Sequence, residues 1–182
     1  MNEHIFKQYD AELESVRAKV LQMGGLVEQQ IINALEALVT ANPKIAAEVM
    51  EADLKVNALE VQVDEDCSHI IARRQPAAGD LRMIMMVVKT ITDLERIGDE
   101  ATKIARVAQK IYESDRLYKP RFTEIKSMVA LVREMLRTSL DAFARLDATK
   151  TADVARQDEQ VDEQFRAAMR QLITFMLEDP RT

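Results

Sequence analysis

The chain has 182 residues, 47% of them hydrophobic and 31% charged, and its formal net charge is −6. Aromatic residues make up only 4%, with four glycines and four prolines, which excludes β-sandwiches and barrels because those folds need frequent turns and aromatic strands. The acidic balance offers no basic face for nucleic acid, and the length suits one domain or two small ones.

Four prolines, at positions 43, 76, 120 and 180, divide the chain into segments with helical periodicity. Proline disfavours a helical conformation in the residue before it, so each proline marks a helix boundary. The composition is rich in helix-forming residues and predicts an all-α fold. Long antiparallel helices joined by short loops are expected at residues 6–41, 44–73, 78–113, 121–147 and 150–178.

The first expected helix has one apolar stripe with helical spacing. The stripe consists of Leu13, Val16, Val20, Leu21, Val27, Ile31, Leu35 and Leu38. Gly24 and Gly25 interrupt this helix at a cost of about 1 kcal/mol each relative to alanine, which predicts close helix packing or a slight kink there.

The second expected helix has an oxygen-rich stripe made of Asp53, Asn57, Glu60 and Asp64. This stripe either lies beside acidic residues of the next helix or forms exposed surface, and periodicity does not decide between the two. Cys67 and His69 have no partner at metal-ligand spacing, so packing or surface positions are expected for them. A single cysteine excludes an intramolecular disulfide and suits a reducing cytosol.

The turn before the third helix is rich in arginine. Arg73 and Arg74 complement the dipole at the end of the second helix, and Asp80 can cap the third helix. An anion site that includes Arg82 is a second interpretation of the same turn.

The third expected helix is apolar on two sides. Its main stripe consists of Met83, Met86, Val87, Leu94, Ile97, Ala101, Ile104 and Ala108, and its opposite side carries Ile84, Val88 and Ile91. A helix that is apolar all round is buried on two sides. Its first half is therefore expected to contact its own bundle and also either the second half of the chain or another subunit.

Glu95 and Asp99 form a pair of acidic residues on this helix, on the face opposite the main stripe. Side chains four residues apart are neighbours, so the two carboxylates can hold a hard cation or an iron-type ion. A solvated face with ion pairs such as Asp99 to Lys103 is the alternative. The same acidic spacing recurs at Glu60/Asp64 and at Asp158/Asp162.

An internal repeat relates the two halves of the chain. A shift of 105 residues aligns Met23 with Met128, Leu35 with Leu140, and Asp53 with Asp158. The repeat predicts tandem three-helix units, the first at residues 1–117 and the second at residues 118–182, truncated to two helices. The second unit lacks a counterpart of the third helix, which would leave a groove. Either the chain is truncated, or another chain fills this groove.

Motifs of enzymes and membrane proteins are missing from the sequence. No Ser/His/Asp arrangement, phosphate-binding loop or dinucleotide fingerprint occurs, and no histidine follows a glutamate by three residues as in di-iron bundles. The first residues lack the basic and apolar regions of a signal peptide, so none is expected, and no apolar run reaches about 18 residues. A cytoplasmic, non-enzymatic protein is expected, with a metal-binding or storage bundle and a structural oligomerisation module as alternatives.

The sequence resembles the PhoU family at residues 73–82 (RRQPAAGDLR), 93–101 (DLERIGDEA), 23–28 (MGGLVE) and 178–181 (EDPR). The resemblance covers essentially the whole chain. It implies two similar three-helix bundles, usually in a homodimer, in which a sixth helix carries a second metal motif. It also implies an accessory protein of phosphate uptake that represses the phosphate-starvation response. Such a protein would link the phosphate ABC transporter to a membrane-bound sensor histidine kinase in signal transduction, and would reach the membrane only through these partners.

The resemblance also implies site residues. The family's metal motif maps onto Glu95 and Asp99, with iron, zinc or magnesium as the metal. Asp53, Glu60, Asp64, Asp158 and Asp162 are further metal candidates, and Arg73, Arg74, Asp80, Arg82 and Arg96 are candidates for partner binding.

Overall fold

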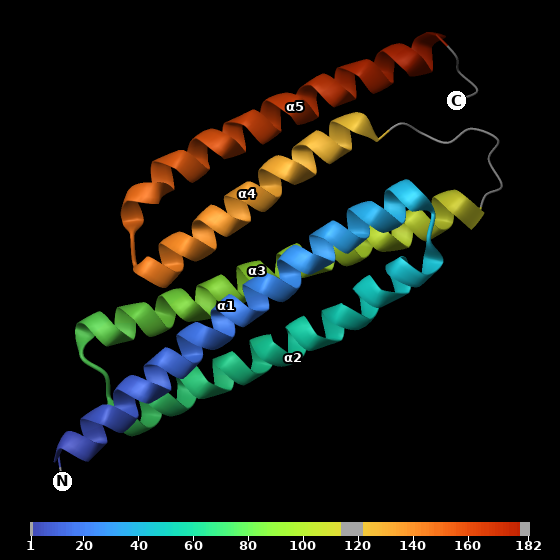
Figure 1. Ribbon diagram of the computed structural model, residues 1–182. Helices are drawn as coiled ribbons and strands as arrows, with labels where there is room; N and C mark the ends of the chain where they lie inside the picture. The colour runs from blue at the N-terminus through green and yellow to red at the C-terminus, as the bar shows by residue number, and fades with distance from the viewer. Residues whose placement is uncertain (1, 114–121, 179–182) are drawn as a thin grey trace. The chain divides into compact units, whose positions relative to one another are not determined.

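A computed structural model describes residues 2–113 and 122–178. The helices are α1 (Asn2–Thr40), α2 (Pro43–Arg74), α3 (Ala78–Glu113), α4 (Thr123–Arg145) and α5 (Thr151–Glu178), with a short 3-10 helix, η1 (Ala148–Lys150), before α5 (Figure 1). The predicted all-α fold is confirmed. None of these helices, within the ranges just given, is both long and apolar enough to span a membrane.

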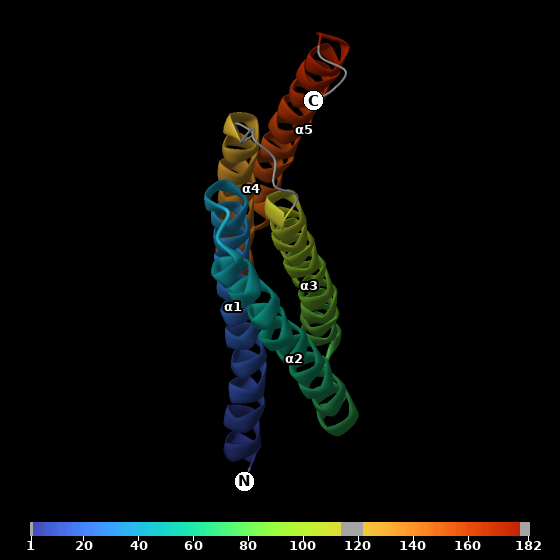
Figure 2. The same ribbon diagram turned by 90° about the vertical axis from the view of Figure 1, so that its right-hand side faces the viewer.

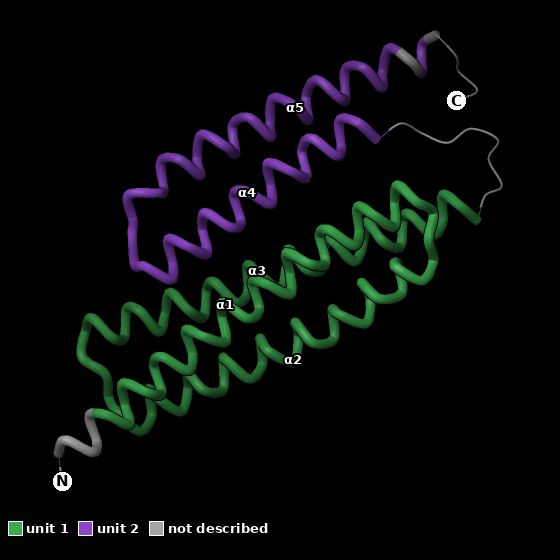
Figure 3. The backbone as a smooth tube through the Cα atoms, viewed as in Figure 1, with its two compact units in different colours: residues 1–116 green, residues 117–182 purple. Residues whose placement is uncertain are grey.

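The chain forms two compact units, residues 1–116 and residues 117–182 (Figure 3). In unit 1, each of α1, α2 and α3 packs against the other two (Figure 2). In unit 2, α4 and α5 pack against each other and η1 joins them. The structure thus contains a three-helix bundle and a helical hairpin.

Local chemistry explains the tight turns of unit 1. Asn42 caps α2 by accepting a hydrogen bond from the backbone N–H of Lys44 at 3.0 Å, and Pro43 occupies the first turn, where a missing N–H costs nothing. At the other end of α2, Gln75 adopts a left-handed conformation with φ 47°, and its N–H bonds to the carbonyl of Ile71. Pro76 follows at once, so α2 cannot continue.

The core of unit 1 lies along the axis of the bundle. α1 contributes Val16, Val20, Met23, Val27, Ala34, Ala37 and Leu38, α2 contributes Ala46, Val49, Val56, Val63, Cys67 and Ile70, and α3 contributes Ile84, Val87, Ile91, Leu94, Ala101, Ala105 and Ala108. Apart from Thr102, the buried positions of α3 alternate in steps of three and four residues, which is the spacing of a coiled coil. Three such stripes facing one another fix the rotation of each helix.

The predicted core face of α3 is partly wrong. Ile84 and Ile91 were expected on the opposite side, but each is 1% exposed and belongs to the core. Met86 and Ile104 belong to the main apolar stripe expected from the sequence, but they are 38% and 39% exposed. Both sides of α3 are apolar in sequence, and packing against α1 and α2 selects the side with the unbroken seven-residue repeat.

The predicted stripe of α1 is wrong at Leu21, which is 37% exposed. A polar residue, Gln30, instead occupies a buried position between Val27 and Ala34. α1 runs unbroken through Gly24 and Gly25. Gly24 is buried, whereas Gly25 is exposed and a Cβ atom built on it would meet no other atom within 4 Å, so close packing does not require glycine at position 25.

The hairpin of unit 2 buries much less of its apolar surface. Among its described residues, Leu136 is the one buried hydrophobic side chain. α5 extends past the start of α4 (Figure 1), and its apolar side chains are largely exposed, as with Phe165 at 55% and Leu172 at 54%. Two helices can cover only one face of each other, so this exposure follows from the architecture.

Candidate functional site

Four carboxylates gather where α2 packs against α3, and we call this group the acidic seam: Asp53 and Glu60 of α2, and Glu95 and Asp99 of α3. All four side chains are half-buried at the edge of the core. They therefore do not lie opposite the core of α3, as the sequence predicted for Glu95 and Asp99. Of the two interpretations of the α2 stripe, a position beside the acids of the next helix holds for Asp53 and Glu60.

The electrostatics of the seam are visible at Glu95. Burial raises the pKa of its carboxyl above the usual value, and the negative charges of Asp99, Glu60 and Asp53 raise it further. The neighbouring guanidinium of Arg96 lowers this pKa, but it is the smallest of the five effects. Repulsion among like charges is what a bound cation would relieve.

Side chains around the seam hold its acids in place. Thr92 donates a hydrogen bond to Glu60 Oε1 at 3.4 Å, and Gln30 donates one to Asp53 Oδ1 at 3.3 Å. The amide oxygen of Asn57, which lies between Asp53 and Glu60 along α2, is buried without a hydrogen-bond partner in the described part of the chain. An orphaned oxygen among carboxylates is a donor set that suits a hard cation.

The geometry stops short of a complete ligand cage. Among the residues that the structure describes, no three His, Cys, Asp or Glu side chains are grouped so that they could hold a metal ion together. Lys103 Nζ lies 2.8 Å from Glu100 Oε1, so the ion pair suggested between Asp99 and Lys103 is replaced by a pair with Glu100. Metal binding by Glu95 and Asp99 stays a prediction.

The other predicted metal candidates lie outside the seam. Asp64 is exposed on α2. Asp158 and Asp162 are exposed on α5, where Asp162 Oδ2 lies 2.8 Å from the guanidinium of Arg166. The shared spacing of these pairs in sequence therefore leads to different surroundings in the structure.

Two of the residues predicted to bind partners, Arg74 and Asp80, make side-chain contacts within unit 1. Arg74 donates two hydrogen bonds to the carboxylate of Glu12, at 3.0 and 2.7 Å, and this contact lowers the pKa of Glu12. Asp80 Oδ2 accepts a hydrogen bond from the Tyr9 hydroxyl at 3.0 Å. Burial, together with this bond, raises the pKa of Tyr9 to about 12.

Asp80 lies inside the first turn of α3 rather than at the capping position that the sequence suggested, because α3 already begins at Ala78. Arg73 and Arg82 are exposed. Arg96 is also exposed and pairs with Asp93 at 3.4 Å on its own helix. Arg73 and Arg82 are therefore exposed arginines on either side of the turn between α2 and α3.

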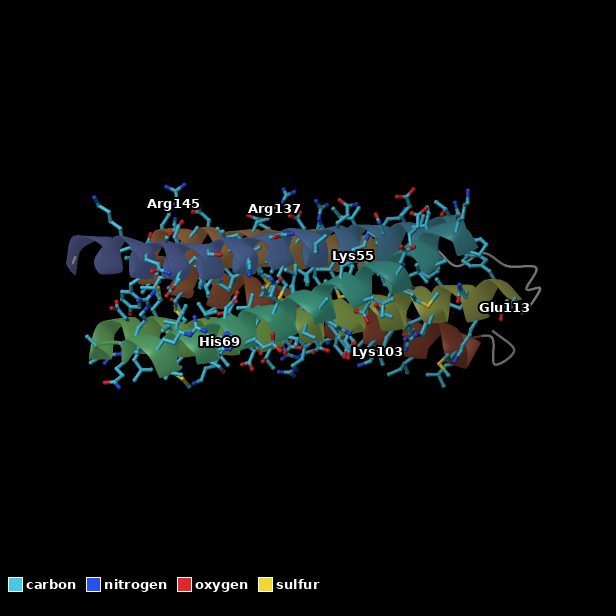
Figure 4. The ribbon with its side chains drawn as sticks, turned by 90° about the horizontal axis from the view of Figure 1, so that it is seen from below. Lys55, His69, Lys103, Glu113, Arg137 and Arg145 are labelled. Atoms are coloured by element: carbon cyan, nitrogen blue, oxygen red, sulfur yellow. The ribbon has the colours of Figure 1, made fainter. Side chains whose placement is uncertain are left out.

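Cys67 and His69 have the unremarkable positions expected of them. Cys67 is buried in the core of unit 1, and burial raises the pKa of its thiol to about 11. His69 is exposed on α2, and exposed charged side chains such as Lys103 and Arg145 are also visible on the helices (Figure 4). The side chain of His4 lies outside the described residues.

Gln30 and Gly98 were missed by the sequence analysis. Gln30 falls on the apolar spacing of α1 between Val27 and Ala34, and Gly98 stands in the middle of a long helix. A polar residue within an apolar stripe and a glycine within a helix are each a signal in sequence, but only the packing of three helices brings them together.

Known proteins resemble the chain along its whole length. The chain matches the PhoU domain over residues 20–108 and 125–182. The phosphate-specific transport system accessory protein PhoU homolog of Pseudomonas putida is 48% identical, over 100% of this chain and 71% of its own length. The phosphate-specific transport system accessory protein PhoU of Escherichia coli K12 is 44% identical, over 100% of this chain and 75% of its own length.

Solved structures extend this similarity to three dimensions. A crystal structure of PhoU from Pseudomonas aeruginosa has a TM-score of 0.89 and 46% identity, covering 95% of this chain and 82% of that one. The phosphate transport system regulatory protein PhoU from Streptococcus pneumoniae has a TM-score of 0.83 and 27% identity, covering 94% of this chain and 80% of that one.

Proposed function

The chain belongs to the PhoU family, and from this premise we propose that it is a cytoplasmic regulator of phosphate homeostasis that acts by binding other proteins. The observation that carries the proposal is similarity along the whole chain to proteins named as accessory to phosphate transport. These relatives are accessory and regulatory proteins rather than enzymes, in agreement with the prediction that the chain is not an enzyme.

The partners we propose are a subunit of the phosphate ABC transporter and a sensor histidine kinase, contacted by a homo-oligomer of the chain. Binding would modulate phosphate uptake and repress the phosphate-starvation response when phosphate is plentiful. A regulator of this kind shifts a partner between states only if it binds one state more tightly than the other. The chain would then reach the membrane through these partners.

An exposed surface at the start of α3 supports protein binding. Leu81, Met85 and Met86 are 38%, 48% and 38% exposed, and Arg82, which is also exposed, lies among them in the sequence. Methionine side chains adapt to irregular partner surfaces, and arginine is enriched at interface hot spots. We define this α3 patch as Leu81, Arg82, Met85 and Met86.

The test is capture of proteins from phosphate-replete cells with the full chain as bait. We expect a transporter subunit or a sensor kinase to be recovered by the wild type and lost with the double variant Arg82→Glu, Met85→Glu. Arg106→Glu is the matched control, since Arg106 is an exposed arginine further along α3. Recovery of neither partner by the wild type contradicts the proposed function, and equal recovery by the double variant contradicts the patch.

Metal binding at the acidic seam is a second candidate, favoured by the clustered acids and the orphaned Asn57 oxygen. Glu95 and Asp99 would hold the ion from α3, with the oxygens of Asp53, Asn57 and Glu60 on the α2 side. When bound, a divalent or iron-type ion would supply the positive charge that the seam lacks. These oxygens would orient the ion, and its positive charge would offset the repulsion among the carboxylates.

Elemental analysis tests this site. The double variant Glu95→Ala, Asp99→Ala should lose bound metal while its helical circular dichroism stays unchanged. Asp158→Ala, Asp162→Ala is the matched control, because it removes the same spacing of acids from an exposed surface. Unchanged metal content in the folded seam variant would contradict the assignment.

A further inference from the structure

We propose that Gln30 is a positioning residue of the acidic seam: its buried amide holds the Asp53 carboxylate, and Gly98 leaves the space in which that amide lies. The proposal rests on the metal-binding function proposed for the same seam. It concerns three residues from three helices, Gln30 of α1, Asp53 of α2 and Gly98 of α3.

The contact of Gln30 with Asp53 has a defined direction. Gln30 is 1% exposed, and its Nε2 donates to Asp53 Oδ1 at 3.3 Å and to the carbonyl of Val49 at 3.5 Å. An ionised carboxylate only accepts hydrogen bonds, so the NH2 group of the amide must face Asp53. The other carboxylate oxygen of Asp53 is then left for an ion at the seam.

Gly98 makes this arrangement possible. A Cβ atom built on Gly98 would lie 2.9 Å from Gln30 Oε1 and 3.6 Å from Asp53 Oδ1, so a side chain here would force the amide to move. No glycine in the described residues has a positive φ, so backbone conformation does not require glycine at this position. The close approach of α3 to the amide is the remaining physical reason for glycine.

Packing alone does not account for an amide at this place in the core. Gln30 Oε1 is buried without a hydrogen-bond partner in the described part of the chain, and an unsatisfied buried oxygen destabilises a fold. An apolar side chain of similar length would avoid that cost. The amide is therefore better explained by what its NH2 group holds.

The internal repeat supplies a comparison within the same chain. A shift of 105 residues places Met135 at the position of Gln30 and Asp158 at the position of Asp53. Met135 cannot donate a hydrogen bond, and Asp158 is exposed. Within the described residues, an amide at this position of the repeat therefore occurs only in unit 1, the unit that contains Glu95 and Asp99.

The predicted effect is on ion affinity. Partners that orient a ligand without touching the ion commonly change affinity by about 10–100-fold when they are removed. Gln30→Met, the residue that the repeat places there, should weaken Mn²⁺ binding measured by calorimetry about tenfold or more, with an unchanged or higher melting temperature. Gln29→Met is the matched control, because the Gln29 amide is exposed and donates a hydrogen bond to Asn33 on its own helix.

A second measurement needs no metal. In the metal-free wild type, the side-chain amide protons of Gln30 should exchange slowly in NMR spectra and should shift on Asp53→Asn. Gly98→Ala should shift the same signals and weaken Mn²⁺ binding. Amide protons that exchange at the rate of those of Gln29 and ignore Asp53→Asn would overturn the proposal, even if Gln30→Met fails to fold.

The two proposals fail in different ways. Equal Mn²⁺ affinity for the wild type and a folded Gln30→Met variant overturns the positioning role while leaving metal binding in place. A wild type that takes up no Mn²⁺ overturns the proposed metal binding, and the NMR signals of Gln30 then decide the contact with Asp53 by themselves.

Discussion

The two units carry the same helical pattern but bury it to different extents. Val20, Met23 and Val27 of α1 are fully buried, whereas their counterparts at a shift of 105 residues, Ile125, Met128 and Val132 of α4, are half-buried. The same holds for α2 and α5. The difference comes from α3, which covers the open side of the α1–α2 pair, while the described part of unit 2 has two α-helices and the short η1. Burial of the apolar side chains on a helical pair thus depends on a third helix more than on the two paired helices themselves.

The largest test of this comparison truncates one side chain in each unit. Met23→Ala should lower the free energy of unfolding by about 2–5 kcal/mol, because Met23 is enclosed by the bundle. Met128→Ala should cost clearly less, since Met128 is half-buried. Urea titrations followed by circular dichroism measure both changes. Equal losses would mean that Met128 is as well enclosed as Met23.

A medium effect is expected from the contact that ties α1 to the end of α2. Arg74→Ala should cost about 1 kcal/mol, because it removes two charge-assisted hydrogen bonds to the partly shielded Glu12. Arg166→Ala in unit 2 should cost about 0.5 kcal/mol or less, because its pair with Asp162 is exposed on one helix. Thermal melts of the two variants give the comparison, and a larger loss for Arg166→Ala would reverse it.

The same contact predicts a pH dependence. Arg74 lowers the pKa of Glu12 in the folded state, so the stabilisation is present above the unfolded pKa and is lost as pH falls through the lowered folded value. The wild type should therefore lose this increment on acidification, and Glu12→Gln should show a shallower acid limb in its stability profile. Parallel profiles for the two proteins would contradict the assignment.

The smallest effect is expected at the acidic seam. Because the pKa of Glu95 is raised in the folded state, ionisation of Glu95 opposes folding as pH rises through that value. Glu95→Gln should stabilise the metal-free protein near neutral pH by about 0.2–0.5 kcal/mol, the usual size of a like-charge pair four residues apart. Asp158→Asn in unit 2 is the control. The melting temperature of Glu95→Gln should lie above that of the wild type without Mn²⁺ and below it with Mn²⁺.

The helices could be predicted from sequence because their boundaries have local causes. Pro43 and Pro76 mark two turns, and α3 spans the expected residues 78–113. The rotation of α3 could not be predicted, since Met86 and Ile84 are equally apolar and only packing against α1 and α2 chooses between them.

For the candidate site too, positions along one helix could be predicted from sequence, but contacts between helices could not. Spacing along one helix places Glu95 beside Asp99, as the sequence suggested. Whether Asp53 and Glu60 face them depends on how α2 and α3 are turned toward each other, which is a property of the whole bundle. The buried Gln30 lay beyond prediction for the same reason, because its partners come from two other helices.

The single cysteine makes the two units distinguishable by a chemical reaction. Cys67 lies in the core of unit 1, and its raised pKa leaves very little thiolate at neutral pH. A thiol reagent can therefore modify the chain only when unit 1 opens, whatever unit 2 does. The rate at which Cys67 is labelled therefore measures how often unit 1 opens in the natural chain, without an added probe.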